Sequence, residues 1–193
     1  MRTRYGHAPA NPAAGKRRKL KTTRPQRPFL EPAQVTALLD AASQLDGEDR
    51  SGRRYRRPLL ATAAFAGLRV GELLSLTWGD VNLATGTIRV RASKTDAGVR
   101  TVDVQPELRD ELAAWKATTR HAEAGHLVFP TSTGRPDNRN NVRRRVLVRA
   151  VERANERIAE EGGCEALPRA CRRTRCAARS PPGSSPRVRT RPT

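Results

Sequence analysis

The sequence predicts a mainly helical α+β fold with one small antiparallel β-sheet. Apolar residues recur at the i, i+3, i+4 and i+7 positions of residues 31–44, as on one face of an amphipathic helix. The period changes to two in residues 87–91 and again in 99–104, on either side of the turn-like sequence SKTDAG. Residues 86–104 are therefore expected to form a β-hairpin or the core of a small meander.

Prolines and glycines mark where the expected helices begin and end. Pro32 suits the first turn of the first helix, and a polar loop over residues 47–57 follows that helix. Pro58 opens an apolar helix that ends at Gly67, a typical C-terminal residue. The remaining expected elements are a short helix over 69–78, a helix opened by Pro106, a buried strand or strand-like connection at 127–129, a loop over 131–138, and a long basic helix that Asn138 caps and that runs to about Glu161.

The positive charge of the chain is concentrated at its two ends. The sequence has 38 Lys and Arg against 19 Asp and Glu, a net charge of +19. Residues 1–28 hold nine basic residues and no acid, and residues 169–193 hold eight and no acid. Residues 29–168 are nearly neutral, with 21 basic and 19 acidic residues. One explanation of this pattern is that the ends are basic arms that neutralise phosphates. The alternative is that one or both ends do not fold and have not been under selection.

Composition also excludes several classes of protein. No apolar run approaches the 18 or more residues of a membrane span, and the basic N-terminus lacks the apolar region of a secretory signal. Three cysteines, an odd number, do not make a disulfide framework, and neither they nor the three histidines have metal-site spacing. We therefore expect a cytoplasmic protein with an anionic partner and without a membrane segment, metal or cofactor.

Three motifs carry a resemblance to a known family. The segment AGLRVGELLSLTWGDV (66–81) resembles the first signature box of the tyrosine recombinase (phage integrase) family. SKTDAGVRTV (93–102) resembles that family's β-hairpin with a catalytic lysine at its turn, and HLVFPTSTGRP (126–136) matches a later element. The resemblance covers about residues 28–168. It implies a tyrosine-recombinase-like catalytic domain that is incomplete at its C-terminus.

The resemblance implies phosphoryl transfer in DNA and a role for each matched residue. In this family a tyrosine attacks the scissile phosphate and forms a 3′-phosphotyrosyl link without ATP or metal. Arg69 would stabilise the phosphate charge, because a guanidinium presents a rigid fork of donors to two oxygens. Lys94 would protonate the leaving 5′-oxygen, and Glu72 matches the family's supporting acidic position. The alternatives are a surface ion pair between Arg69 and Glu72 and a solvated Lys94; Trp78 is expected in the core.

Double-stranded DNA is the expected partner, and the resemblance implies a tetramer on DNA for the intact family. The basic helix residues could contact phosphates or form a solvated face. A basic cluster in the N-terminal arm gives a second set of contacts. These candidate DNA-binding residues are Arg143, Arg144, Arg145, Lys16, Arg17, Arg18 and Lys19.

The family's later elements, an H-x-L-R box and the nucleophilic tyrosine, do not occur in this sequence. The two tyrosines, Tyr5 and Tyr55, both precede Arg69, so no nucleophile is assigned. Residues 169–193 are compatible with GC-rich DNA read out of frame and are expected to be a disordered tail, while 1–28 is expected to be a linker after a missing core-binding domain. We expect a recombinase fragment that is inactive alone. The other hypotheses are a non-catalytic DNA-binding regulator and a basic RNA-associated protein.

Overall fold

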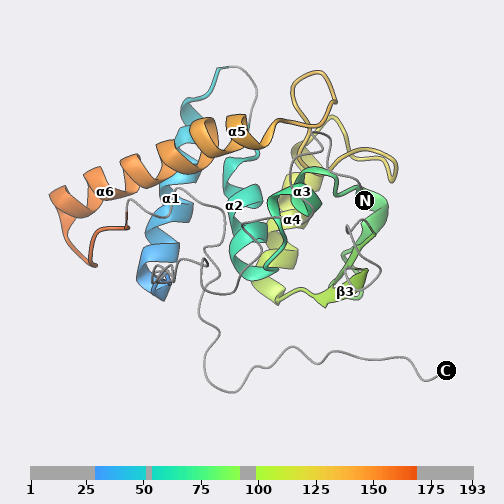
Figure 1. Ribbon diagram of the computed structural model, residues 1–193, viewed down its shortest axis with the longest axis horizontal. Helices are drawn as coiled ribbons and strands as arrows, with labels where there is room; N and C mark the ends of the chain where they lie inside the picture. The colour runs from blue at the N-terminus through green and yellow to red at the C-terminus, as the bar shows by residue number, and fades with distance from the viewer. Residues whose placement is uncertain (1–28, 51–53, 92–98, 169–193) are drawn as a thin grey trace, which may run out of the picture.

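The computed structural model describes residues 29–50, 54–91 and 99–168 (Figure 1). The predicted mainly helical α+β class with a small antiparallel sheet is confirmed. In this part of the chain no helix is both long enough and apolar enough to cross a membrane. In chain order the elements are α1 (Pro32–Glu48), α2 (Arg56–Phe65), α3 (Val70–Leu74), the 3-10 turn η2 (Trp78–Asp80), β1 (Val81–Asn82), β2 (Thr87–Val90), β3 (Arg100–Asp103), α4 (Pro106–Thr118), α5 (Arg139–Val142), the π-helical stretch η4 (Arg143–Val148) and α6 (Arg149–Glu161).

The sheet is the expected meander, with strand order β1-β2-β3 and both pairings antiparallel. Ile88 lies opposite Val81 on one side and Val102 on the other. Ile88 and Val90 are buried, whereas Arg89 between them is exposed, because alternate side chains point to opposite faces of a sheet. Residues 92–98, where the sequence predicts the turn that carries Lys94, lie outside the described residues.

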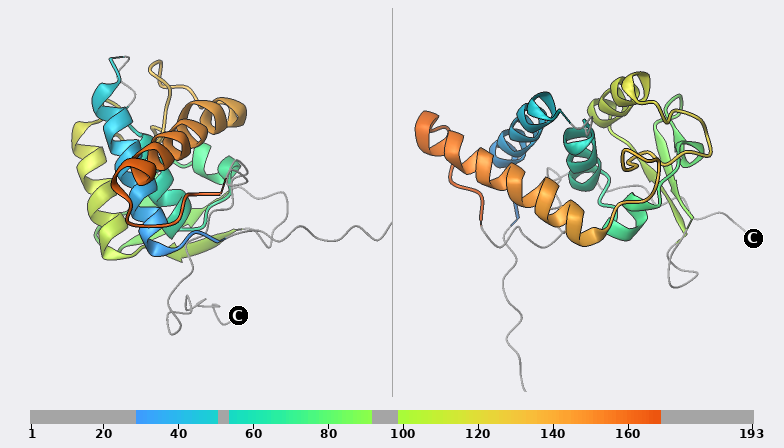
Figure 2. Two further views of the ribbon diagram at one scale, coloured as in Figure 1. Left: turned by 90° about the vertical axis from the view of Figure 1, so that its left-hand side faces the viewer. Right: turned by 90° about the horizontal axis from the view of Figure 1, so that it is seen from above.

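The sheet lies at one end of the molecule beside α3 and α4, and α1 and α6 lie at the other end (Figures 1 and 2). α1 packs against both α2 and α6, and α2 packs in turn against α4. One continuous core of buried aliphatic residues joins these helices to the sheet, with Leu39, Leu59, Leu112 and Ile88 among them. The core therefore fixes where the connection from α2 to α3 meets the strands.

The long helix expected after Asn138 is present as α5, η4 and α6 in continuous succession. The Asn138 side chain accepts a hydrogen bond from the Asn140 backbone N–H at 2.8 Å, as a capping residue does. Its middle stretch is π-helical rather than α-helical, a local widening that the sequence did not signal. Val146 and Ala150 are buried against the core, so the helix is anchored along one face.

The loop predicted over 47–57 is shorter than expected, because α1 continues to Glu48 and α2 begins at Arg56 instead of Pro58. Asp46 explains the early start: its carboxylate accepts the backbone N–H groups of Arg56 and Arg57 at 3.2 and 3.0 Å. These N–H groups belong to the first turn and have no partner inside the helix. Pro58 then sits in the same first turn, where a missing N–H costs little.

The helix predicted over 69–78 is wrong in its second half, because α3 ends at Leu74. The Ser75 hydroxyl donates to the Gly71 carbonyl at 3.0 Å, and Thr77 forms an isolated bridge with Leu127 instead of continuing the helix. The prediction that Trp78 belongs to the core is confirmed, since only 2% of it is exposed. Its indole N–H donates to the His121 carbonyl at 2.7 Å.

Residues 165–167 fold back onto the helices. The Asn155 side chain both accepts from the Leu167 N–H at 2.7 Å and donates to the Leu167 carbonyl at 3.1 Å. The Gln34 amide donates to the Glu165 carbonyl at 3.0 Å. Leu167 itself is buried, so the packed region extends through this segment.

Candidate phosphate-binding site

The sequence around Arg69 folds into a tight turn followed by a one-turn helix. Gly67 has a φ of +62°, which lets the chain leave α2 in a conformation that favours glycine. Leu68 is then buried, and Arg69 precedes α3 with extended backbone angles. The exposed Arg69 thus lies between two buried residues of this segment, Leu68 and Glu72.

Glu72 holds Arg69 through both its backbone and its side chain. One Glu72 oxygen accepts the Arg69 backbone N–H at 2.9 Å, as an acid at the third position of a helix does. The other oxygen accepts Arg69 Nη1, also at 2.9 Å. The expected pair therefore forms, but it differs from an ordinary surface ion pair because Glu72 is only 8% exposed.

A second arginine, Arg100 on β3, reaches the same carboxylate. Its Nη1 and Nη2 atoms donate to the two Glu72 oxygens at 3.2 and 3.0 Å, a bidentate contact. Burial acts to raise the pKa of Glu72, but hydrogen bonds from Arg100 and from the backbone and side chain of Arg69 outweigh it. The pKa falls from its usual 4.5 to about 2. Glu72 is therefore anionic near neutral pH.

The side chain of Arg69 remains 62% exposed while Glu72 holds one of its nitrogen atoms. No other described residue accepts a hydrogen bond from this guanidinium. Two guanidinium groups share one carboxylate, so the cluster keeps a net positive charge. An exposed guanidinium that is fixed at one edge can present its other donors to a phosphate oxygen.

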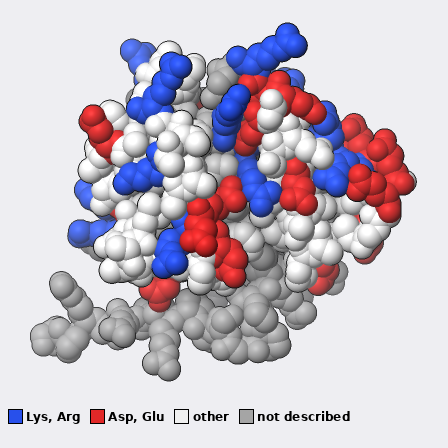
Figure 3. Space-filling model, turned by 180° about the vertical axis from the view of Figure 1, so that it is seen from behind, with Lys and Arg blue, Asp and Glu red and all other residues white. Residues whose placement is uncertain are grey.

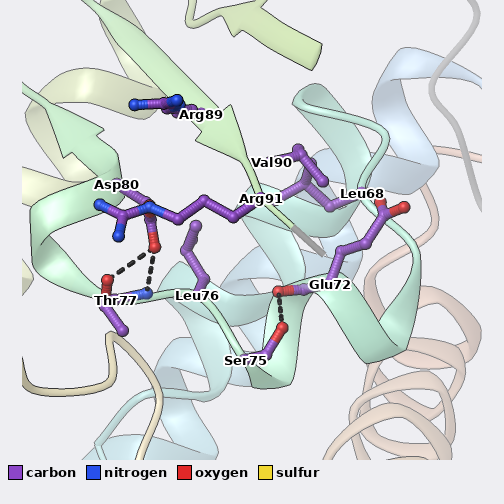
Figure 4. A pocket seen from close by; sticks show the side chains of 9 residues that line it. All are labelled: Leu68, Glu72, Ser75, Leu76, Thr77, Asp80, Arg89, Val90 and Arg91. Carbon is purple, nitrogen blue, oxygen red and sulfur yellow. Dashed lines mark hydrogen bonds and ion pairs between the residues drawn. The ribbon is translucent and has the colours of Figure 1, made fainter. Parts of the chain in front are cut away.

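A small cavity beside Glu72, of about 170 Å³, lies between α3 and the end of β2 (Figure 4). Asp80 lies in its wall and accepts the Thr77 hydroxyl at 2.6 Å. Arg91 extends from the end of β2 toward Asp80 and forms an ion pair with it. This pair connects the end of β2 to the 3-10 turn η2.

Arg139 approaches the same helix from the start of α5. A Cβ atom added to Gly71 would lie only 2.5 Å from Arg139 Nη2, so the guanidinium lies directly over this glycine. Gly71 and Arg139 also line one shallow cavity of about 600 Å³. A side chain at residue 71 would therefore have to displace the end of the Arg139 side chain.

The described residues contain no group of His, Cys, Asp and Glu side chains arranged to hold a metal ion. The positive charge at this site comes instead from arginine side chains. These arginines are Arg69, Arg91, Arg100 and Arg139, and they come from the segment between α2 and the start of α5.

The model of the phage integrase family matches residues 28–175, most of the chain. The chain belongs to the phage integrase family. A curated relative, prophage integrase IntR of Escherichia coli (strain K12), is 35% identical over 86 residues, which cover 39% of this chain and 21% of that protein.

Solved structures of recombinases and integrases share the fold. XerA recombinase has a TM-score of 0.53 at 22% identity, covering 70% of this chain and 46% of the solved chain. The Tn1549 transposon integrase in complex with a circular intermediate DNA has a TM-score of 0.57 at 20% identity, covering 81% and 54%. The chain therefore spans about half the length of these structures. The likeness establishes the tyrosine recombinase catalytic fold.

In this phage integrase chain the structure brings together only part of the predicted site. Arg69 and Glu72 are in contact, and Arg143, Arg144 and Arg145 are exposed on η4. Lys94 and the predicted DNA-binding cluster of the N-terminal arm, Lys16, Arg17, Arg18 and Lys19, lie outside the described residues.

The sequence analysis missed three arginines near α3: Arg91, Arg100 and Arg139. Arg100 carried one usable signal: strand alternation puts it on the same face as Val102, which packs against the core. An arginine on the inward face of a strand needs an acidic partner. Nothing in the local sequence pointed to the contact between Arg139 and Gly71.

Proposed function

We propose that this chain supplies the Arg69 half of the phosphate-binding site of a site-specific recombinase that acts on double-stranded DNA in the cytoplasm. The observation that carries the proposal is the geometry of Arg69, which is 62% exposed yet held by a buried carboxylate. Such a side chain loses little conformational freedom when it binds a phosphate. Family membership supports DNA as the substrate.

The proposed chemistry is phosphoryl transfer to a tyrosine. The tyrosine oxygen bonds to phosphorus while the bond from phosphorus to the 5′-oxygen breaks, so the phosphodiester energy is kept in the new link. Arg69 balances the charge that develops on the phosphate oxygens. Lys94, between β2 and β3 in the sequence, gives its proton to the leaving 5′-oxygen. Glu72 and Arg100 position Arg69 and do not touch the substrate.

The attacking tyrosine is the part that this chain does not provide. Tyr55 is 2% exposed, and its hydroxyl donates to Asp137 at 3.0 Å, so it is a core residue. Tyr5, the other tyrosine, lies far before Arg69 in the sequence. We propose that the chain binds DNA without forming a covalent link, unless another protomer of the family's tetramer supplies the tyrosine. The burial of Tyr55 equally favours a non-catalytic DNA-binding regulator.

The distribution of charged residues along the sequence divides the chain into three segments. We propose that residues 1–28 act as a basic arm, that 29–168 form the partial catalytic domain, and that the basic residues of 169–193 add non-specific attraction. Acidic and basic side chains are mixed on the face opposite the view of Figure 1 (Figure 3). Within the domain, we expect DNA contacts from local clusters such as the exposed Arg143, Arg144 and Arg145.

Fluorescence anisotropy with a labelled duplex of about 30 base pairs tests the proposal. We expect Arg69→Gln to weaken binding by roughly fivefold to tenfold, as the loss of one charged phosphate contact does. Arg109→Gln is the matched control, because Arg109 also pairs with one acid, Asp110 at 3.7 Å, but lies on α4. Equal affinities for the two variants would remove Arg69 from the DNA contacts and leave the regulator hypothesis.

A further inference from the structure

A second cluster of arginines lines a cavity away from Arg69. The cavity has a volume of about 410 Å³ and is lined by Arg50 and Arg54 from the connection between α1 and α2, and by Arg120 just after α4. None of the residues that line it also lines either of the two cavities beside α3. It is therefore a separate place on the domain.

Arg50, Arg54 and Arg120 have no acidic partner in the described part of the chain, whereas eight of the other fifteen arginines in the described residues form ion pairs. Arg56, Arg57, Arg91, Arg100 and Arg153 each form ion pairs. No described carboxylate lies within ion-pairing distance of Arg50, Arg54 or Arg120, and all three are exposed. Like charges around one cavity repel one another, so binding an anion there relieves an unfavourable interaction.

Two aromatic side chains, Tyr55 and Trp115, are among the residues that line the cavity. Tyr55 and Trp115 meet edge to face, with ring centroids 6.4 Å apart. Their polar atoms are already used: the Tyr55 hydroxyl donates to Asp137, and the Trp115 indole N–H donates to the Val128 carbonyl at 2.7 Å. The two aromatic side chains therefore shape the cavity, but their donors are already used and are not available to hydrogen-bond the edge of a base.

Several side chains that line the cavity have donors with no acceptor among the described residues. They are the three guanidinium groups, the hydroxyls of Thr119 and Ser132, and the imidazole of His121. Several guanidinium donors around a cavity suit a compact anion with several acceptor oxygens, which describes a phosphodiester. A site of this kind binds DNA independently of sequence.

We propose that Arg50, Arg54 and Arg120 bind a backbone phosphate of the DNA duplex other than the phosphate at Arg69. This inference rests on the proposed function, because it takes DNA as the anion. The site would hold the duplex at a second point and thereby fix its direction across the domain. Two separated phosphate contacts determine an orientation, which a single contact cannot do.

The test compares two double variants of the full chain that lose the same charge. Arg54→Gln with Arg120→Gln alters the cavity, and Arg109→Gln with Arg157→Gln is the control, since both control residues pair with acids elsewhere. Affinity for a duplex of about 30 base pairs is measured from about 50 to about 300 mM salt. We expect roughly tenfold weaker binding for the cavity variant and a salt slope smaller by about one. The control should stay within about twofold of the unchanged chain.

The outcomes separate this inference from the proposed function. If the unchanged chain does not bind the duplex, both fail. If Arg69→Gln weakens binding but the cavity variant matches its control, only the second phosphate site is overturned. A titration of the unchanged chain with inorganic phosphate, followed by the amide resonances of Arg54, Arg120 and Ser132, gives a readout that does not depend on variant folding. Saturable shifts support the site, and their absence overturns it.

Discussion

Arg100 on β3 contacts both carboxylate oxygens of Glu72 on α3, at 3.2 and 3.0 Å. The same carboxylate holds the backbone and side chain of Arg69. The sheet is thus connected to the residue expected to bind phosphate through one buried acid. A displacement of β3 would be transmitted to Arg69 by way of Glu72.

The low pKa of Glu72 predicts an acid-sensitive contribution to stability. Its folded-state pKa of about 2 lies below its usual 4.5, so the contribution is complete above pH 4.5 and is lost as the pH falls from 4.5 to about 2. The difference corresponds to at most about 3–4 kcal/mol in the free energy of unfolding. We expect Glu72→Gln to remove this part of the pH dependence in urea denaturation. Glu160→Gln, at an exposed position, should keep it; an unchanged pH profile in Glu72→Gln would contradict the prediction.

Replacing Arg100 should destabilise the domain. Arg100→Gln leaves the buried Glu72 with Arg69 alone, and we expect a loss of about 2 kcal/mol in the free energy of unfolding. Arg100→Lys should recover only part of it, because an ammonium cannot reproduce the bidentate contact. Chemical denaturation measures both. Arg89→Gln, on the exposed face of the same sheet, is the control, and an equal loss there would refute the special role of Arg100.

Gly71→Ala should displace Arg139 while the fold persists. The new methyl group would lie 2.5 Å from Arg139 Nη2, and the flexible end of that side chain must move. Alanine is a better helix former than glycine by about 1 kcal/mol, so the free energy of unfolding should not fall. The Arg139 side-chain resonances should shift in NMR spectra. Gly47→Ala, where the added Cβ meets no heavy atom within 4 Å, should leave them in place.

Most of the non-specific attraction to DNA should come from the chain ends. These ends hold 17 of the 19 net positive charges. Removing residues 1–28 and 169–193 should therefore reduce both the affinity at low salt and the steepness of its salt dependence. Anisotropy titrations at several salt concentrations measure both quantities, with circular dichroism to confirm folding. Equal binding by residues 29–168 would show that the domain itself carries the contacts.

The 193-residue chain should form no covalent adduct with a nicked suicide substrate. Covalent catalysis requires the nucleophile within reach of phosphorus, and Tyr55 is buried and hydrogen-bonded to Asp137. Denaturing gel electrophoresis of the chain incubated with labelled DNA is the measurement. An adduct formed by the chain alone, and lost in Tyr5→Phe or Tyr55→Phe, would overturn the assignment.

Local patterns predicted the features that depend on neighbours in the sequence. Pro32, Pro106 and Asn138 marked helix starts correctly, and the alternation around Ile88 marked the strands. The contact between Arg69 and Glu72 is local too, since Glu72 is the third residue after Arg69. These predictions succeeded because capping and periodicity are properties of short segments.

The errors arose where distant residues decide the structure. α2 begins early because Asp46, ten residues before Arg56, accepts its first N–H groups. α3 stops early because Thr77 pairs with Leu127. The role of Arg100 depends on a carboxylate 28 residues away. Contacts at such separations leave no periodic trace in the sequence.

The way in which Gln34 and Asn155 hold residues 165–167 has an evolutionary consequence. The side-chain amides of Gln34 and Asn155 contact main-chain atoms, and of the three residues only Leu167 packs its side chain into the core. Drift at Glu165 and Ala166 should therefore be nearly neutral, whereas a polar residue at 167 should be selected against. Among homologous proteins, we expect residues 165 and 166 to vary freely and residue 167 to remain aliphatic.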